Sequence, residues 1–424
     1  MTTRRQFILG VTSLGALSVI AAPSFGATQS PQSATAVTRV YGDGLRFVAV
    51  ALTYPSAVST ADLAGASFAV AGRTVTEVYP ASSTDPDDRA DSGPVVIVAL
   101  SETDTDASLA VTPMQAGPGG QGGRPDWNVG DRNISDTIWA TPQATVYAPD
   151  RIETDAVRNL IVDEFQQHVW NDPETGDTLP YNLFVPADYD PAKTYPLVNF
   201  MHDAGACSDD PLFTLKQGLG AISWASPEDQ AARPAFVLAP QFAEIVAGDN
   251  NTTSSMLDTV INLIKHLTTE YSIDPARLYT TGQSGGGMLS IAMNIKYPDF
   301  FAASFLVACQ WGADLVAPMA GQKLFILVSQ DDSIAFPGQN AITAALEAAG
   351  ADIARAVWDG RWSADQFQFA FDDLISEGAR INYVSFAEGT VIPPGESTEG
   401  AAGHRNTWRI AYTIAPIREW ILRT

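Results

Sequence analysis

Short runs of apolar residues, broken by turn-forming residues, dominate the chain between Val37 and Asp150. Few stretches in this region repeat apolar residues at helical spacing. Runs of this length that are rich in β-branched residues and bounded by glycine, proline or aspartate are typical of antiparallel strands. We expect strands at Leu45–Leu52, Ser67–Val70, Thr74–Tyr79, Pro94–Leu100 and Ser108–Thr112. The pattern predicts an all-β, immunoglobulin-like sandwich over residues 37–150.

Beyond residue 150, apolar strands alternate with helical stretches. The expected strands are Leu183–Val185, Leu197–Met201, Phe236–Ala239, Leu278–Thr281, Ser304–Ala308, Leu324–Val328 and Ile381–Phe386. The clearest helix is Met256–Tyr271, in which Val260, Leu263 and Leu267 fall on one apolar stripe. Such alternation predicts a mostly parallel sheet with helices on both faces. The sequence therefore predicts an α/β domain over residues 151–424.

The first 27 residues have the features of an export signal. Arg4 and Arg5 are followed by Phe7, an apolar run and small residues up to Ala27, as in a twin-arginine signal peptide. Residues 28–36 are rich in serine, threonine and glutamine and predict a linker. No other run approaches the 18 apolar residues of a membrane span. We expect an exported protein, periplasmic or extracellular, that does not span a membrane.

The charge and the cysteine and histidine content of the chain exclude several classes of partner and cofactor. The net charge of −24 repels nucleic acid and anionic lipid, so neither is expected as a partner. The chain has no H-E-x-x-H motif, and its two cysteines, Cys207 and Cys309, lack the spacing of zinc ligands. We therefore expect no metal and no organic cofactor. Export permits a disulfide, and whether Cys207 and Cys309 pair is open at this point.

A G-x-S-x-G pattern at Gly282–Gly286 lies between an expected strand and a helix-like segment, Met288–Ile295. A nucleophile elbow requires this strand, turn and helix, with glycines where the turn leaves no room for a side chain. The pattern predicts that Ser284 is a nucleophile. The alternative is a glycine-serine loop without chemistry.

A serine nucleophile needs a base and an acid, which in α/β-hydrolases follow it in the order acid, then histidine. His404 is the only one of the four histidines after Ser284, and we expect it in a loop before a C-terminal helix. The strand Leu324–Val328 leads into Asp331 and Asp332. We predict Asp332 as the acid from the loop spacing, with Asp331 as the alternative.

The intermediate of acyl transfer also needs hydrogen-bond donors for its oxyanion. One predicted donor is the Gly285 N–H, directly after the nucleophile. The other should come from the loop that follows Leu197–Met201, where we predict the Ala204 N–H, with Gly205 as the alternative. His202, in the same loop, is expected to be structural.

Three segments of the second region, Tyr181–Gly205, Tyr271–Pro275 and His404–Leu422, resemble a known family. It consists of exported α/β-hydrolase esterases and predicted peptidases, related to polyhydroxyalkanoate depolymerases and prolyl-oligopeptidase-type hydrolases. Val40–Gly44 and Phe68–Val70 resemble members with an immunoglobulin-like N-terminal domain. The resemblance implies a serine carboxylesterase with the triad Ser284, Asp332 and His404. The chain departs from the family at Asp203, usually glycine, and at Gly285, commonly a methionine-like residue.

The function expected from these residues is hydrolysis of a small-molecule or polymeric ester through an acyl-enzyme. A serine peptidase of the prolyl-oligopeptidase type and a polyester depolymerase would use the same triad. A non-catalytic binding protein, with a β-sandwich that docks a polymer, is the alternative outside the hydrolases. The acyl group, the alcohol and the oligomeric state are left open by the sequence.

Overall fold

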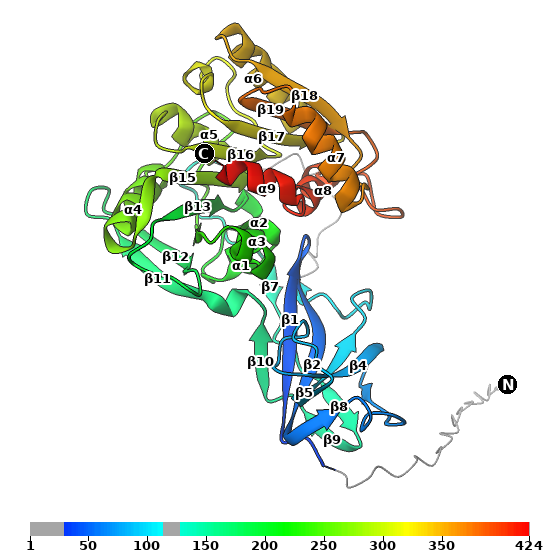
Figure 1. Ribbon diagram of the computed structural model, residues 1–424. Helices are drawn as coiled ribbons and strands as arrows, with labels where there is room; N and C mark the ends of the chain where they lie inside the picture. The colour runs from blue at the N-terminus through cyan, green and yellow to red at the C-terminus, as the bar shows by residue number, and fades with distance from the viewer. Residues whose placement is uncertain (1–28, 113–127, 424) are drawn as a thin grey trace, which may run out of the picture.

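The computed structural model describes residues 29–112 and 128–423, so the predicted signal peptide lies outside the described residues. An N-terminal β domain is joined to a larger α/β domain (Figure 1). Within the described part of the chain, no helix has the length and apolarity needed to cross a membrane.

The N-terminal domain packs two main sheets face to face. The larger sheet has five strands in the order β10-β1-β2-β5-β4, with bounds Ala156–Asn159, Ser33–Tyr41, Gly44–Ser59, Ser92–Leu100 and Val75–Ala81. The smaller sheet joins β3 (Ala69–Val70), β8 (Thr145–Ala148) and β9 (Asp150–Glu153). Val50 and Val96 of the larger sheet share a core with Val146 of the smaller one. A short ribbon pairs β6 (Ala110–Val111) with β7 (Ile138–Trp139).

The strands of this domain extend past the limits drawn from the sequence. β1 begins at Ser33, inside the segment expected to be a linker, because alternate residues Ala34 and Ala36 are fully buried. β10 lies beyond residue 150 and pairs in parallel with β1.

The second domain is built on a nine-stranded sheet. Its order is β11-β12-β14-β13-β15-β16-β17-β19-β18, with bounds Phe165–Asn171, Thr178–Phe184, Phe236–Pro240, Tyr195–Met201, Ile273–Gln283, Ala303–Val307, Leu324–Ser329, Ile381–Phe386 and Ile353–Trp358. In this order, all pairings from β14 to β18 are parallel. β12 pairs antiparallel with both of its neighbours, β11 and β14. Each of the seven strands expected from the sequence coincides with a strand of this sheet.

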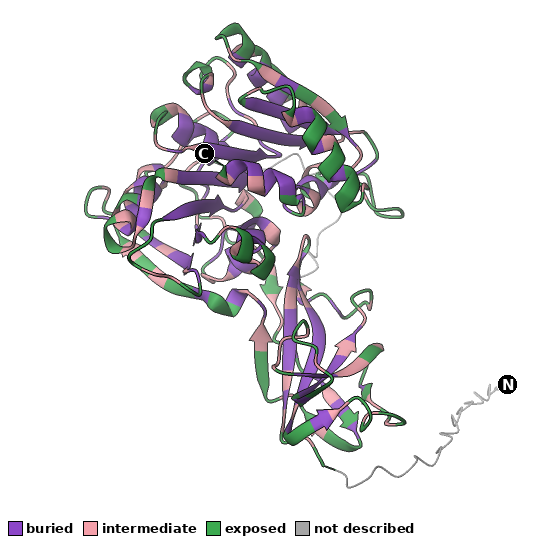
Figure 2. Cartoon of the chain, viewed as in Figure 1, coloured by how far each residue is buried: buried purple, intermediate pink, exposed green. Residues whose placement is uncertain are grey.

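Helices cover both faces of this sheet. Successive residues of each strand point to opposite faces, and on the inner strands both sets are apolar. Phe325 and Leu327 of β17 pack in the core that holds α7, α8 and α9, whereas Leu324 and Ile326 pack in the core that holds α4, α5 and α6. The inner strands, such as β17, are accordingly buried, whereas the edge strands β11 and β18 are partly exposed (Figure 2). The helices are α1 (Phe213–Lys216), α2 (Leu219–Ile222), α3 (Pro227–Ala232), α4 (Met256–Glu270), α5 (Gly285–Lys296), α6 (Ala335–Ala348), α7 (Ala364–Ile375), α8 (Ala402–Ala411) and α9 (Ala415–Leu422). Short 3-10 turns are η1 (Val162–Glu164), η2 (Ala204–Ala206), η3 (Ser223–Ala225) and η4 (Ala317–Met319).

The β1–β2 turn of the N-terminal domain touches the second domain at helix α8. A methyl group at Gly42, in this turn, would lie 2.7 Å from the carbonyl oxygen of Arg409. At Gly44 it would lie 2.5 Å from the Trp139 ring. Glycine therefore allows the turn to approach both neighbours closely.

Candidate active site

Ser284 occupies a strained turn between β15 and α5. Its φ and ψ angles are 50° and −120°, in a region that residues with a side chain rarely adopt. The conformation is held by two backbone hydrogen bonds: the Ser284 N–H donates to the Val307 carbonyl at 3.0 Å, and the Met288 N–H donates to the Ser284 carbonyl at 2.9 Å. The sheet and the helix therefore fix the position of the serine.

The glycines around Ser284 are there because backbone lies directly against them. A methyl group at Gly282 would lie 2.4 Å from the carbonyl carbon of Gly286, and one at Gly286 would lie 2.0 Å from the Met201 carbonyl oxygen. Gly287 is confined by a side chain instead, since a methyl group there would lie 2.7 Å from Cys309 Cβ and 2.8 Å from its Sγ. These approaches allow α5 to start in close contact with β13.

Gly286→Ala is expected to destabilise the protein severely, although alanine favours a helix over glycine by about 1 kcal/mol. The added methyl group would overlap backbone atoms of β13, which can move only if the sheet moves with them. Thermal unfolding and the yield of soluble protein measure the effect. Gly321→Ala is the matched control, because no atom lies within 4 Å of its added methyl group. Equal melting temperatures for the two variants would contradict the close packing of the elbow.

His404 lies in the first turn of α8, so the expectation that it lies in a loop is wrong. Gly403, the residue before it in this helix, packs on the loop after β17: a methyl group there would lie 2.4 Å from Asp331 Cβ. His404 Nε2 is 2.9 Å from Ser284 Oγ, and Nδ1 is hydrogen-bonded to Asp332 Oδ2. Since a carboxylate only accepts, Nδ1 carries the proton and Nε2 accepts from the serine hydroxyl.

Asp332 is buried, and both of its carboxylate oxygens accept hydrogen bonds. Its Oδ1 accepts from the backbone N–H groups of Ala335 at 2.9 Å and Ile334 at 3.1 Å. Burial alone would raise the pKa of Asp332, but the hydrogen bonds from His404 and these N–H groups outweigh burial and lower the pKa below its usual value. Asp332 is therefore ionised at neutral pH. Its contribution to stability is present above the ordinary pKa of aspartate and is lost as the pH falls through the lowered value.

Asp331, the alternative acid, is engaged elsewhere. Both of its carboxylate oxygens accept from the Gly389 N–H at 3.0 Å, and Ser329 Oγ donates to Oδ2 at 3.2 Å. Asp331 thus ties the loop after β19 to the end of β17. The structure brings Ser284, His404 and Asp332 together and leaves Asp331 outside this group.

The two predicted oxyanion donors lie beside the serine. Ala204, Ser284 and Gly285 line one small cavity, together with Ala247, Gly248, Asp249 and Met288. The position of a methyl group on Gly285 is 3.3 Å from the Ala204 nitrogen, so the two segments are in contact. Gly285 is the first residue of α5, where a helix leaves its N–H groups without partners inside the helix. Both donors therefore border the space above Ser284.

His202 lies in the same loop as Ala204 and connects it to the segment after β14. It is buried, and its Nε2 accepts from the Phe242 N–H at 2.9 Å. Burial lowers the pKa of His202, which keeps the ring neutral and able to accept this bond. The structure therefore gives it a structural role.

Several contacts around the site were not predicted from the sequence, although Asp203 was singled out there as a departure from the family. Gln283 and Asp203 are hydrogen-bonded to each other beside Ser284. Asn133, between β6 and β7, donates to the Ala204 carbonyl at 2.7 Å. Asn133 and Ala204 are 71 residues apart in the sequence, and no motif includes the asparagine, so this contact could not be predicted. Its amide nevertheless helps to hold the loop that carries a predicted oxyanion donor.

Cys207 and Cys309 are buried free thiols and are not paired with each other. Burial raises the pKa of each thiol to about 12, so both remain protonated and unreactive. Among the residues that the structure describes, no group of three or more His, Cys, Asp or Glu side chains is placed to hold a metal ion.

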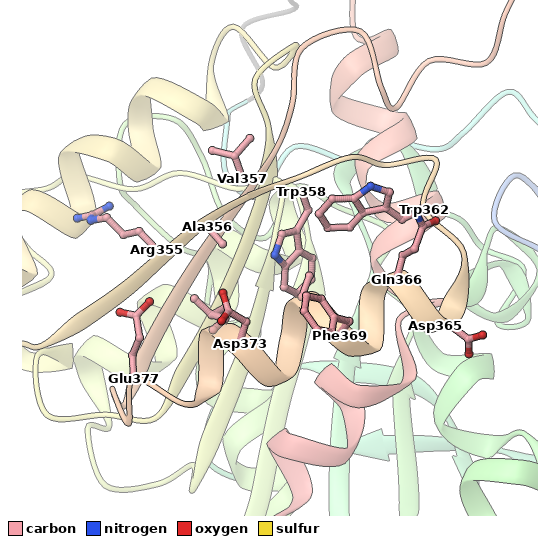
Figure 3. Close-up of a pocket in the computed structure, with 12 residues that line it drawn as sticks. Arg355, Ala356, Val357, Trp358, Trp362, Asp365, Gln366, Phe369, Asp373 and Glu377 are labelled. Carbon is pink, nitrogen blue, oxygen red and sulfur yellow. The ribbon is translucent and has the colours of Figure 1, made fainter.

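A larger hollow of about 530 Å³ lies at the edge strand β18 and helix α7 (Figure 3). Trp362 and Phe369 line it together with Asp365 and Asp373. It is four strands from β15 in the sheet order, or roughly 19 Å at the usual strand spacing. This hollow is therefore separate from Ser284.

Comparisons with known proteins agree with this architecture. Residues 33–156 match the family described as "Esterase Ig-like N-terminal domain", and residues 241–312 match the "Prolyl oligopeptidase family". A solved structure of a thermostable esterase superposes with a TM-score of 0.72 at 24% identity, covering 92% of this chain and 98% of that one. This likeness confirms the predicted fold class, an all-β immunoglobulin-like domain followed by an α/β-hydrolase domain.

Sequence similarity to a curated protein is local. Acetylxylan esterase A of Emericella nidulans is 36% identical over 61 residues, which are 14% of this chain and 18% of the length of that relative. The two family matches confirm the resemblance seen in the sequence. The chain thus resembles the "Esterase Ig-like N-terminal domain" family over residues 33–156 and the "Prolyl oligopeptidase family" over residues 241–312.

Proposed function

We propose that the protein is a serine hydrolase that cleaves carboxylic esters with Ser284, His404 and Asp332 as its triad. The observation that carries this proposal is the continuous chain of hydrogen bonds from Ser284 Oγ through His404 to Asp332. The serine is in a strained elbow at the N-terminus of a helix, as a hydrolase nucleophile should be.

In the proposed reaction, Ser284 Oγ attacks the ester carbonyl while His404 Nε2 takes the hydroxyl proton. Asp332 stabilises the imidazolium that forms and keeps the proton on Nδ1. The N–H groups of Gly285 and Ala204 stabilise the tetrahedral oxyanion. Protonated His404 then gives its proton to the leaving alcohol. A water molecule, activated by neutral His404, releases the acid and regenerates Ser284.

Hydrolysis of p-nitrophenyl esters of graded acyl length, from acetate to octanoate, tests the proposal directly. We expect turnover with at least the short esters, because the cavity that Ser284 lines is small. Peptide p-nitroanilides are assayed in parallel. Cleavage of peptides without turnover of any ester would contradict the proposal.

A serine peptidase is the second candidate, and the match of residues 241–312 to the prolyl oligopeptidase family favours it. The same triad can cleave amides, so the substrate panel separates the two functions. A protein inert toward both substrate classes would instead favour the binding role considered for the β-sandwich.

We also propose export to the periplasm or beyond through the twin-arginine pattern at Arg4 and Arg5. Localisation of the full chain, compared with an Arg4→Lys/Arg5→Lys double variant, tests it. Retention of only the variant in the cytoplasm is the expected result.

A further inference from the structure

Asp203, where the chain departs from the glycine common in the family, is hydrogen-bonded at both carboxylate oxygens. Oδ1 accepts from the Gly205 N–H at 2.9 Å and so caps the turn η2. Oδ2 accepts from Gln283 Nε2 at 3.0 Å. One carboxylate thus connects the oxyanion loop to the residue that precedes Ser284.

Gln283 is almost fully buried, at 1% exposure, and its amide has a second partner. Nε2 also lies 3.2 Å from Gln217 Oε1, directly after helix α1. The Gln283 side chain is therefore confined between Asp203 and Gln217, and displacing it would break two partly buried hydrogen bonds.

The backbone pairing of β13 with β15 ends just before this contact. The last pair in the register is Met201 with Gly282. Ala204 and Gly285 lie beyond it, where this strand ladder no longer sets the distance between the two segments. The Asp203–Gln283 bond continues the connection past the end of the ladder.

We propose that Asp203 and Gln283 are positioning residues that hold the N–H groups of Ala204 and Gly285 at the separation an oxyanion requires. The inference rests on the proposed function. An oxyanion hole is effective because its donors are fixed before the reaction, so a loop that can drift loses transition-state stabilisation while substrate binding is kept.

Asp203→Ala and Gln283→Leu are each expected to lower kcat for p-nitrophenyl acetate by about 10- to 100-fold with KM unchanged. The double variant should be no slower than the slower single variant, because both changes break the same bond. Asp203→Asn should recover most of kcat, because its amide oxygen can still accept from the Gly205 N–H and its amide nitrogen can donate to Gln283 Oε1 once the Gln283 and Gln217 amides flip together, which keeps the bond between them.

Asp274→Ala is the matched control. Asp274 accepts from the Ala276 N–H and from Arg277 Nε, both at 2.9 Å, near the opposite end of β15. It is expected to leave kcat unchanged. If Asp203→Ala lowered the melting temperature while kcat stayed unchanged, or if the effects of Asp203→Ala and Gln283→Leu on kcat were additive, the proposal would be overturned.

Amide hydrogen exchange tests the same connection without any substrate. Exchange at residues 204–206 should be faster in Gln283→Leu than in the parent protein, and unchanged exchange would refute the proposal. A parent protein that turns over no ester would refute the proposed function, whereas the exchange measurement would still decide whether Asp203 and Gln283 fix the loop.

Discussion

Ser284→Ala is expected to lower kcat/KM for p-nitrophenyl acetate by about 10⁴-fold or more, because the proposed acyl-enzyme forms on the Ser284 hydroxyl. The fold should be unaffected: the elbow is held by backbone bonds to Val307 and Met288, which alanine retains. Residual hydrolysis, about 10³-fold above the uncatalysed rate, should persist, since the proposed oxyanion donors remain. Initial rates and circular dichroism of the same preparation measure both quantities.

Ser272→Ala is the control for this variant. Ser272 Oγ donates to the Pro191 carbonyl at 2.7 Å, just before β15 begins and far from the elbow. Its removal should leave kcat/KM unchanged. Undiminished ester hydrolysis by Ser284→Ala would show that another residue is the nucleophile.

Asp332→Asn is expected to reduce kcat by about 10⁴-fold while leaving the site well folded. The asparagine amide would donate to His404 Nδ1, so the ring proton would move to Nε2. Nε2 would then face Ser284 as a donor and could not take the serine proton. Steady-state kinetics with a short-chain ester measure the loss.

Asp331→Asn separates the two adjacent aspartates. Its remaining carbonyl oxygen can still accept from the Gly389 N–H, so we expect kcat to change by less than about threefold. A greater loss from Asp331→Asn than from Asp332→Asn would reverse the proposed assignment of the acid.

The sequence predicted the inner part of the catalytic sheet but not its margins. The expected strands of this domain are all inner ones, and the two strands missed, β11 and β18, are the two edges. Inner strands are buried on both faces and form continuous apolar runs. Edge strands are half exposed: β11 carries Gln166 and Gln167, and β18 carries the exposed Arg355. Because of these polar residues, neither strand forms a continuous apolar run in the sequence.

The parts of the candidate site that could be predicted are those with a local motif or a fixed order of triad residues in the sequence. Ser284 has a local motif, and His404 follows from its position after the serine. The local structure at His404 was not predictable, because Gly403 and the preceding glycines suggest a loop. Gly403 is in fact part of α8, and its lack of a side chain allows close contact with Asp331. The Asp203–Gln283 bond joins segments 80 residues apart and leaves no local pattern.

The contact between the β1–β2 turn and α8 bears on biosynthesis. It joins Gly42 to Arg409, which is translated long after it. His404 lies on that same helix, so neither the domain contact nor the proposed triad can form until α8 has left the ribosome. A nascent chain that stops short of α8 would therefore be inactive. The proposed ester hydrolysis should appear only once this helix has emerged and docked, which is compatible with the proposed export of a folded protein.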